Sequence, residues 1–215
     1  MLTGKTLFLA RHAETVFNRS ARLQGNEAHT PLTSGGVRQA IAMADALKDH
    51  LGSKQDVVFW ASPTGRTRQT AAVIADALDI DYFSIRFDDR LKEIDVGDWT
   101  GRTYADVTAE CGPIVDASRR LFIQRPPGGE WYDDMVGRLS AWAQDVDKEA
   151  APMHLAVSHG LASRVLRGVI TGQRWHADIA ATVADDIPQG HFCALSGQVE
   201  TCFATSGPAS HGRGF

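Results

Sequence analysis

Residues 5–10 (KTLFLA) form a short apolar run that ends directly in the polar residues 11–15 (RHAET). A run of this length indicates a buried β-strand, and two similar runs occur at 56–61 (DVVFWA) and 153–158 (MHLAVS). Each is followed by a stretch that predicts a helix, at 34–51, 62–78 and 161–170. This alternation predicts an α/β fold, a three-layer α/β/α sandwich around a mostly parallel sheet.

The remaining chain gives weaker signals. We expect a strand at 82–87, a helix at 132–149 and a hairpin whose strands, 191–195 and 199–204, flank residues 196–198. Ser62-Pro63 is suited to start the second helix, and Gly52 to end the first. Residues 98–130, which Gly-Pro and Pro-Pro-Gly-Gly interrupt, predict a lid or insertion over one sheet edge. A single domain over 1–205 and a flexible tail over 206–215 are expected.

Composition excludes several classes of protein. The 215 residues carry a formal charge of -4, which disfavours a nucleic-acid binder. No apolar run approaches the roughly 20 residues that span a bilayer, and the N-terminus does not resemble a signal peptide. Three widely spaced cysteines without a Cys-x-x-Cys pair disfavour a disulfide framework or a zinc–cysteine site. We therefore expect a cytoplasmic protein without nucleic-acid or membrane partners, and the oligomeric state stays open.

The three predicted strands deliver chemically useful residues at their carboxyl ends, which meet at one edge of a parallel sheet. The first delivers Arg11 and His12, the second leads to Arg66, and the third delivers His159 and Gly160. Arginine side chains bind phosphate through paired donors, and an imidazole can attack phosphorus. A packed histidine or an exposed helical arginine explains each residue alone. Their convergence favours an anion site with a nucleophile.

These residues also lie in a pattern that resembles the histidine phosphatase superfamily, which includes the cofactor-dependent phosphoglycerate mutases. Residues 11–15 (RHAET) are similar to its Arg-His-Gly-Glu-Thr signature, with Ala13 in place of Gly. Further matches follow in order from about residue 5 to 170: Asn18, Gln24-Gly25, Pro31-Leu32-Thr33, Ser62-Pro63, Arg66-Thr67, Leu91-Lys92-Glu93, Gly128-Gly129-Glu130 and Ser158-His159-Gly160. The resemblance implies a phosphoglycerate mutase-like fold.

The resemblance also implies a role for each matching residue. His12 would attack phosphorus to give a phosphohistidine, while Arg11, Arg66 and His159 hold the phosphoryl oxygens. Glu93 would protonate the leaving group and then activate water, although a solvated loop carboxylate is the alternative reading. The candidate substrate-binding residues are Asn18, Gln24, Gly25, Gly160 and Glu130. Because the pocket carries so much fixed positive charge, no metal ion or other cofactor is expected.

Residues around this centre favour a phosphatase over a mutase. Ile94 follows Glu93 where mutases carry Arg, and Leu161 follows Gly160 where they carry Asn. Residues 129–134 (GEWYDD) resemble a stretch of the phosphatase branch. In contrast, Arg119-Arg120 resembles an arginine pair with which mutases bind the distal acid group, or is a solvated basic pair. The expected activity is hydrolysis of a small phosphorylated metabolite; a mutase and a non-catalytic phosphate-binding protein are the alternatives.

Other phosphatase chemistries fit the sequence poorly. A cysteine phosphatase needs Arg six positions after its Cys, and Cys111, Cys193 and Cys202 are followed there by Ala117, Val199 and Pro208. The pair Asp79 and Asp81 has the spacing of a haloacid dehalogenase-like site but follows a helix. A metal site from His154, His159 and His176 lacks an evident common face. Specificity is expected on residues 15–33 and 98–130, where Trp99, Phe122, Trp131 and Tyr132 form either an apolar wall or a lid core.

Overall fold

A six-stranded sheet organises the computed structural model, which describes residues 1–51, 57–172 and 174–208. The strand order is β10-β9-β1-β6-β2-β3. Four strands run parallel: β1 (Thr6–Arg11), β6 (Met153–Ser158), β2 (Val57–Ala61) and the short β3 (Arg86–Phe87). The hairpin of β9 (Phe192–Ser196) and β10 (Val199–Phe203) joins β1 in antiparallel fashion. The mostly parallel sheet confirms the predicted fold class.

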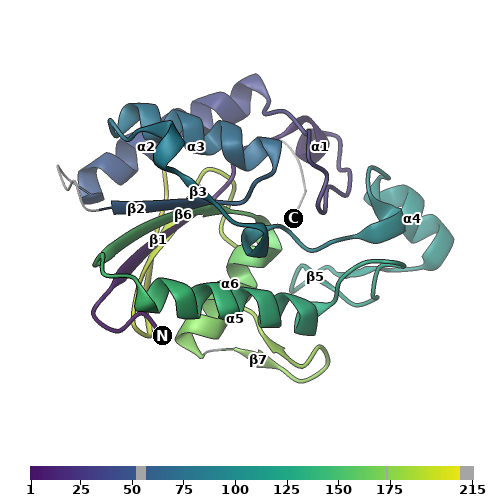
Figure 1. The fold of residues 1–215 in the computed structure, drawn as a ribbon. Helices are drawn as coiled ribbons and strands as arrows, with labels where there is room; N and C mark the ends of the chain where they lie inside the picture. The colour runs from purple at the N-terminus through teal and green to yellow at the C-terminus, as the bar shows by residue number, and fades with distance from the viewer. Residues whose placement is uncertain (52–56, 173, 209–215) are drawn as a thin grey trace.

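Helices cover both faces of this sheet (Figure 1). Helices α2 (Ser34–Leu51) and α3 (Gly65–Ala77) lie on one face, and α5 (Tyr132–Lys148) and α6 (Gly160–Thr171) lie on the other. Side chains of β1 alternate between the two resulting cores: Leu7 and Leu9 belong to the α5/α6 core, whereas Phe8 and Ala10 belong to the α2/α3 core. A strand buried on both faces needs such a continuous apolar run, which is why 5–10 contains little else.

Several predicted boundaries need correction. Helix α3 begins at Gly65, so Thr64 rather than Ser62 occupies its N-cap position, and the Thr64 side chain makes no capping hydrogen bond. The strand predicted over residues 82–87 is reduced to the two residues of β3, and a 3₁₀ turn, η1 (Tyr82–Ser84), precedes it. β3 lies at the edge of the sheet, where a strand forms hydrogen bonds with one neighbour instead of two. In the predicted tail, the Pro208 carbonyl accepts a hydrogen bond from Gln39 Nε2 at 2.9 Å, so its first residues pack on α2. The predicted helix end at Gly52 and the tail residues 209–215 lie outside the described residues.

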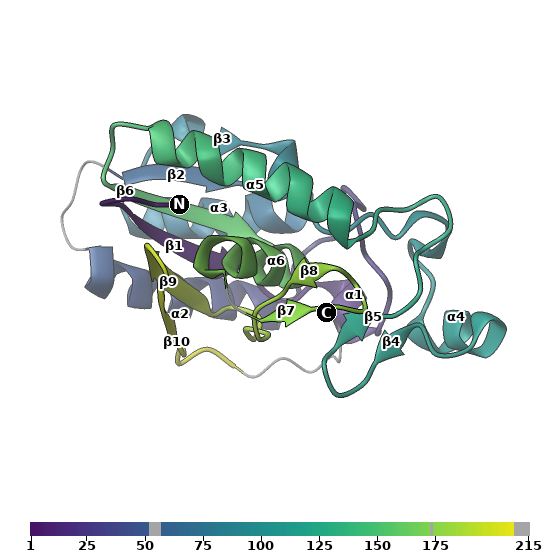
Figure 2. The ribbon, with the colours of Figure 1, turned by 90° about the horizontal axis from the view of Figure 1, so that it is seen from below.

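The segment 98–130 has secondary structure of its own. It contains most of η3 (Gly97–Trp99), then α4 (Tyr104–Cys111), β4 (Val115–Asp116) and β5 (Leu121–Phe122). Figures 1 and 2 show α4, β4 and β5 projecting from one end of the sandwich rather than covering a sheet edge. Ion pairs join this insertion to the segment of β7 (Trp175–His176) and β8 (Ala181–Thr182): Arg119 contacts Asp178, and Arg120 contacts Asp186.

The arginine pair of the insertion is partly exposed to solvent, with both side chains in ion pairs rather than free as anion ligands. Both side chains are in ion pairs, and Arg119 also contacts Asp116, three residues earlier. These contacts fix where the insertion lies.

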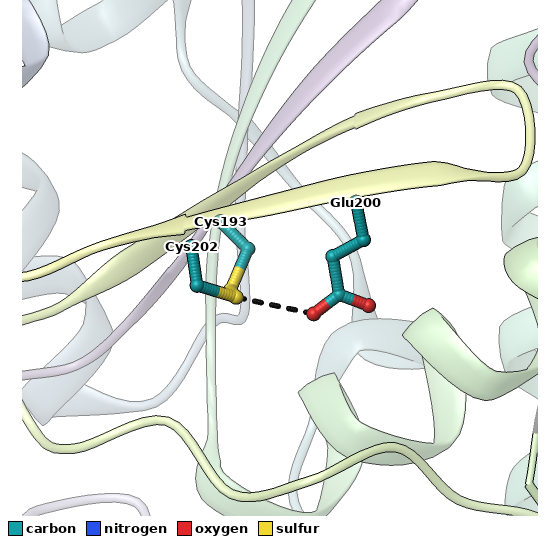
Figure 3. A group of neighbouring side chains, drawn as sticks. All are labelled: Cys193, Glu200 and Cys202. Carbon is teal, nitrogen blue, oxygen red and sulfur yellow. Dashed lines mark hydrogen bonds between the residues drawn. A yellow bond between two sulfur atoms is a disulfide. The ribbon is translucent and has the colours of Figure 1, made fainter.

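The two strands of the C-terminal hairpin place Cys193 directly opposite Cys202, and the pair forms a disulfide. Figure 3 shows this bond with Glu200 beside it. The sequence expectation against disulfides was wrong here, because spacing alone does not reveal which residues a hairpin register brings together. Cys111 is exposed and free. Among the described residues, no helix has the length and apolar character to cross a membrane.

One glycine fixes how α2 meets the loop after β1. A Cβ at Gly36 would lie 2.1 Å from the backbone oxygen of Glu14, a distance that no side chain tolerates without movement of the backbone. The close approach brings α2 against the residues that follow His12. In the same region Thr33 Oγ1 donates to Glu14 Oε1 at 2.7 Å, and Arg19 pairs with that oxygen at 3.0 Å. Glu14 therefore positions neighbouring groups.

Candidate active site

A small cavity of about 20 Å³ lies where the parallel strands end. His12 follows β1, Arg66 lies in the first turn of α3 after β2, and Glu93 follows the 3₁₀ turn η2 (Asp89–Leu91). All three line the cavity together with Gln24 and Gly25. The topology thus brings together residues that are separated by 81 positions along the chain, from His12 to Glu93.

The ring of His12 is fixed in one tautomer. Its Nδ1 lies 2.8 Å from the Ala13 carbonyl oxygen, which only accepts hydrogen bonds, so Nδ1 carries the proton. Burial, with the charges of Arg66 and Arg11, lowers the pKa of His12 well below its ordinary value of 6.5. The neutral ring therefore leaves a lone pair on Nε2, which is the atom a nucleophilic imidazole uses.

His159 lies beside His12, with ring centroids 5.2 Å apart. Its Nδ1 accepts a hydrogen bond from Arg66 Nε at 3.1 Å, so its proton lies on Nε2, 2.8 Å from Ser62 Oγ. Burial and the charge of Arg66 lower the pKa of His159 well below its ordinary value. The two buried histidines are therefore both neutral at pH 7, and they carry their protons on different nitrogens.

Arg66 is held in the pocket by backbone oxygens. Its Nη2 donates to the Gly25 carbonyl at 2.6 Å and its Nη1 to the Glu27 carbonyl at 2.8 Å. Burial lowers the pKa of Arg66 from 12.5 to about 10, so the group stays charged at pH 7. Carbonyl partners orient the guanidinium without neutralising its charge, which leaves that charge available to an anionic ligand.

Arg11 is fully buried in the same region. Its Nη1 donates to Asp186 Oδ1 at 3.0 Å and to the Ile187 carbonyl at 2.8 Å. Burial lowers the pKa of Arg11, although the nearby Asp186 acts in the opposite direction. Asp186 thus links the last residue of β1 to the segment that follows β8.

The carboxylate of Glu93 sits at the N-terminus of α6. Its Oε1 accepts from the backbone N–H groups of Ile94 (3.0 Å) and Ala162 (2.9 Å), and its Oε2 accepts from Leu161 N–H (3.1 Å). The helix N-terminus favours negative charge at this place. A carboxylate has about four acceptor positions, so one position is left for a group in the cavity that Glu93 lines. The Glu93 carboxylate is therefore held in place by backbone hydrogen bonds and is not a solvated loop carboxylate.

The predicted binding residues differ in their placement. Asn18, in α1 (Val16–Arg19), accepts from Thr15 through Oδ1, and its buried Nδ2 has no hydrogen-bond partner among the described residues. Gln24 and Gly25 line the cavity. Gly25 has φ +48°, and a Cβ there would meet the backbone nitrogen of Val96 at 2.9 Å, so the close turn requires glycine. Gly160 starts α6 directly after His159.

Glu130 does not lie in the cavity. Its two oxygens bind Arg138, at 2.8 and 2.9 Å, and Oε2 also accepts from the backbone N–H of Asp95 at 3.0 Å. Arg138 in turn donates to the carbonyl oxygens of Lys92 (2.8 Å) and Glu93 (3.2 Å). Glu130 therefore supports the loop that carries Glu93 instead of contacting a ligand in the cavity.

Sequence reasoning missed part of the site. Its cavity is also lined by Arg22, Leu23, Ile94, Val96, Tyr104 and Leu161, and Phe122 was named only as one possibility. Ser62, predicted as a helix cap, is the partner of His159. Asp186 carried no sequence signal, because its link to Arg11 spans 175 positions. Among the histidines weighed as an alternative metal site, His154 accepts from Trp60 Nε1 at 3.3 Å and is not among the residues that line the cavity.

Fold and site together define an α/β protein with a neutral histidine between buried arginines at the strand ends. The model of the "Histidine phosphatase superfamily (branch 1)" matches residues 7–182, and the chain belongs to this superfamily. Over 172 residues it is 34% identical to the "Probable phosphoglycerate mutase GpmB" of Salmonella paratyphi C (strain RKS4594), which covers 77% of this chain and 74% of the relative.

Solved structures agree with this fold. A mycobacterial glucosyl-3-phosphoglycerate phosphatase, solved with VO3, has a TM-score of 0.76 at 24% identity, covering 95% of this chain and 100% of the other. The alpha-ribazole phosphatase from Shigella flexneri has a TM-score of 0.71 at 23% identity, covering 95% and 97%. At these identities the similarity is one of fold.

Proposed function

We propose that the protein is a metal-independent phosphomonoesterase that hydrolyses a small phosphorylated metabolite through a phosphohistidine on His12. The observation that carries the proposal is the state of His12: Nδ1–H is bound to the Ala13 carbonyl, and the ring is neutral. Its Nε2 lone pair is therefore present at neutral pH, next to the charges of Arg11 and Arg66. Those two charges supply the electrostatic stabilisation that a bound cation gives in other phosphatases.

The reaction has two steps. In the first, Nε2 of His12 forms a bond to phosphorus, the bond from phosphorus to the ester oxygen breaks, and Glu93 gives a proton to the leaving alkoxide. In the second, Glu93 takes a proton from water, whose oxygen attacks phosphorus and breaks the N–P bond. The products are the alcohol and inorganic phosphate, and His12 returns to its starting state. Arg11, Arg66 and Asn18 hold the phosphoryl oxygens in both steps, and His159 orients Arg66 through its Nδ1.

Hydrolysis of p-nitrophenyl phosphate from pH 5 to 8 in the presence of EDTA tests this proposal. We expect the wild type to turn over and His12→Ala to lose at least about a thousandfold in kcat/KM. His50→Ala is the matched control, because His50 is exposed at the end of α2 and stacks on Phe203 outside the cavity. Labelling with ³²P-phosphoester should give an acid-labile, base-stable adduct. Hydrolysis by His12→Ala within tenfold of the wild type would refute the assigned nucleophile.

A phosphoglycerate mutase is the second candidate, and the printed name of the 34% identical relative favours it. In a mutase, the phosphoryl group on His12 passes back to a hydroxyl of the substrate, so water must be kept out. Ile94 and Leu161, both at the cavity, have no polar side-chain group with which to hold a phosphoglycerate. Interconversion of 3- and 2-phosphoglycerate with a bisphosphate primer, faster than release of phosphate, would favour the mutase.

A further inference from the structure

Apart from His12, Arg66 and Glu93, the side chains that line the cavity are largely apolar. Leu23, Ile94, Val96, Phe122 and Leu161 make up this apolar wall, each at most 2% exposed, and Tyr104 adds a half-buried ring. The phosphoryl group of a substrate must lie against the histidines and arginines. The alcohol part of the substrate then lies against this wall.

Contacts within the chain hold the wall in place. Residues 21–25 pair with 101–104: Leu23 N–H donates to the Arg102 carbonyl at 2.9 Å, and Gly101 N–H donates to the Leu23 carbonyl at 2.8 Å. Behind it, the rings of Trp99 and Phe122 lie 6.2 Å apart. A wall held by backbone pairing and buried rings has a fixed shape, so it selects ligands by shape and polarity.

The polar side chains along this wall are Arg22, Gln24 and Tyr104. Among the described residues that line the cavity, the cations are Arg22 and Arg66, and Arg66 belongs to the phosphoryl end. Arg22 donates to the Gly101 carbonyl at 2.6 Å, which holds the insertion against residues 21–25. Gln24 Oε1 accepts from Thr15 Oγ1 at 2.8 Å. A sugar with several hydroxyls would lose its bonds to water against aliphatic side chains without replacing them.

From this wall we infer that the substrate is a phosphomonoester of a compact apolar or aromatic alcohol. This rests on the proposed function, because it assumes that the histidine and arginine end of the cavity takes the phosphoryl group.

Binding of three phosphonates to the wild-type protein, measured by titration calorimetry, tests the inference without turnover. Benzylphosphonate has a ring, methylphosphonate has none, and 3-phosphonopropanoate has a carboxylate in its place. We expect benzylphosphonate to bind at least about fivefold more tightly than either of the others. A smaller preference would overturn the inference. Tightest binding of 3-phosphonopropanoate would also overturn it and would make Arg22 a ligand for a distal anion.

Two variants test whether the wall causes the preference for benzylphosphonate. Phe122→Ala, or Tyr104→Ala if the first variant does not fold, should remove most of the preference for benzylphosphonate and leave the affinity for methylphosphonate within about twofold. Phe83→Ala is the matched control, since Phe83 is 91% exposed and should change neither affinity. An unchanged preference in both wall variants would place the ring elsewhere and refute the assignment.

Turnover separates this inference from the proposed function. Benzyl phosphate and glycerol phosphate are both esters of primary alcohols, so their intrinsic reactivity is similar and kcat/KM compares recognition. A benzyl preference in both binding and turnover supports both proposals. The phosphonate preference without hydrolysis of any ester would refute the phosphatase and retain the apolar ligand. Hydrolysis that favours glycerol phosphate would refute the apolar substrate and retain the phosphatase.

Discussion

Replacing Glu93 with Gln tests how the helix N-terminus of α6 holds the proposed acid and base. The carboxylate accepts three backbone N–H groups, two through Oε1 and one through Oε2. A glutamine can keep its carbonyl oxygen toward Ile94 and Ala162, but its NH₂ group then faces the N–H of Leu161. The hydrogen bond from Leu161 N–H to the charged Oε2 is therefore lost, and two N–H donors face each other in its place.

The cost follows from these contacts. Loss of a hydrogen bond to a charged group removes about 1.5–3 kcal/mol, and loss of negative charge at a helix N-terminus removes about 0.3–1 kcal/mol. Glu93 also attracts the buried charges of Arg66 and Arg11, which lose that partner. We therefore expect the free energy of unfolding of Glu93→Gln to fall by about 2–4 kcal/mol, although the substitution keeps the size of the side chain.

Urea denaturation followed by far-UV circular dichroism measures this loss, and steady-state kinetics measures the effect on catalysis. Without a proton donor, kcat for an alkyl phosphate should fall by about 10²- to 10⁴-fold. The fall for p-nitrophenyl phosphate should be smaller, since its leaving group needs less protonation. A loss of stability below about 1 kcal/mol would contradict the assigned hydrogen bonds. Equal losses of rate for both esters would contradict the role of Glu93 as the acid.

Three further predictions concern packing, pH and the disulfide. Gly36→Ala should lower the free energy of unfolding by at least about 3 kcal/mol in urea denaturation, whereas Gly137→Ala, in open space on α5, should raise it by about 0.5–1 kcal/mol. The folded-state pKa values of His12 and His159 lie below 6.5, so the unfolded chain binds more protons than the folded protein at acid pH. The free energy of unfolding should therefore fall below pH 6.5, by up to about 1.4 kcal/mol per pH unit for each ring. A free energy of unfolding that stays constant between pH 6.5 and 5 would contradict the burial of the two rings as neutral groups. Cys202→Ser should cost about 2–3 kcal/mol under oxidising conditions and nothing relative to wild type in dithiothreitol.

The sheet could be predicted because its strands are buried on both sides. Residues 153–158 were predicted with the observed bounds, and 5–10 and 56–61 were each within one residue at either end, since a doubly covered strand must be apolar throughout. The two-residue β3 has no such run, and its 3₁₀ turn was not foreseen. The insertion was located by its Gly and Pro residues, but its course depends on distant ion pairs such as Arg119 with Asp178.

For the site, strand ends brought His12 and Arg66 to one cavity, as their positions after apolar runs predict, with His159 beside both. The assignment of catalytic roles to these residues stays a prediction. Asp186 was missed, because nothing in the local sequence marks a residue whose partner is far along the chain. Of the four aromatic residues predicted as either an apolar wall or a lid core, Phe122 lines the cavity, whereas Trp99, Trp131 and Tyr132 are not among its lining residues. The disulfide could be predicted from the hairpin, because a turn centred on residues 197 and 198 pairs residue 193 with residue 202.

The Asp186 carboxylate is shared between two arginines, with Oδ1 on Arg11 at the strand end and Oδ2 on Arg120 in the insertion. This sets a rule for protein engineering. A chimera that exchanges residues 98–130 for those of another family member could carry a new substrate wall on an unchanged catalytic frame. Such a graft must either keep a cation at position 120 or remove the surplus negative charge at 186. Without Arg120, the Asp186 carboxylate keeps its ion pair with Arg11 but loses the one with the insertion. Exchanging the insertion would then also change the net charge near the catalytic pocket.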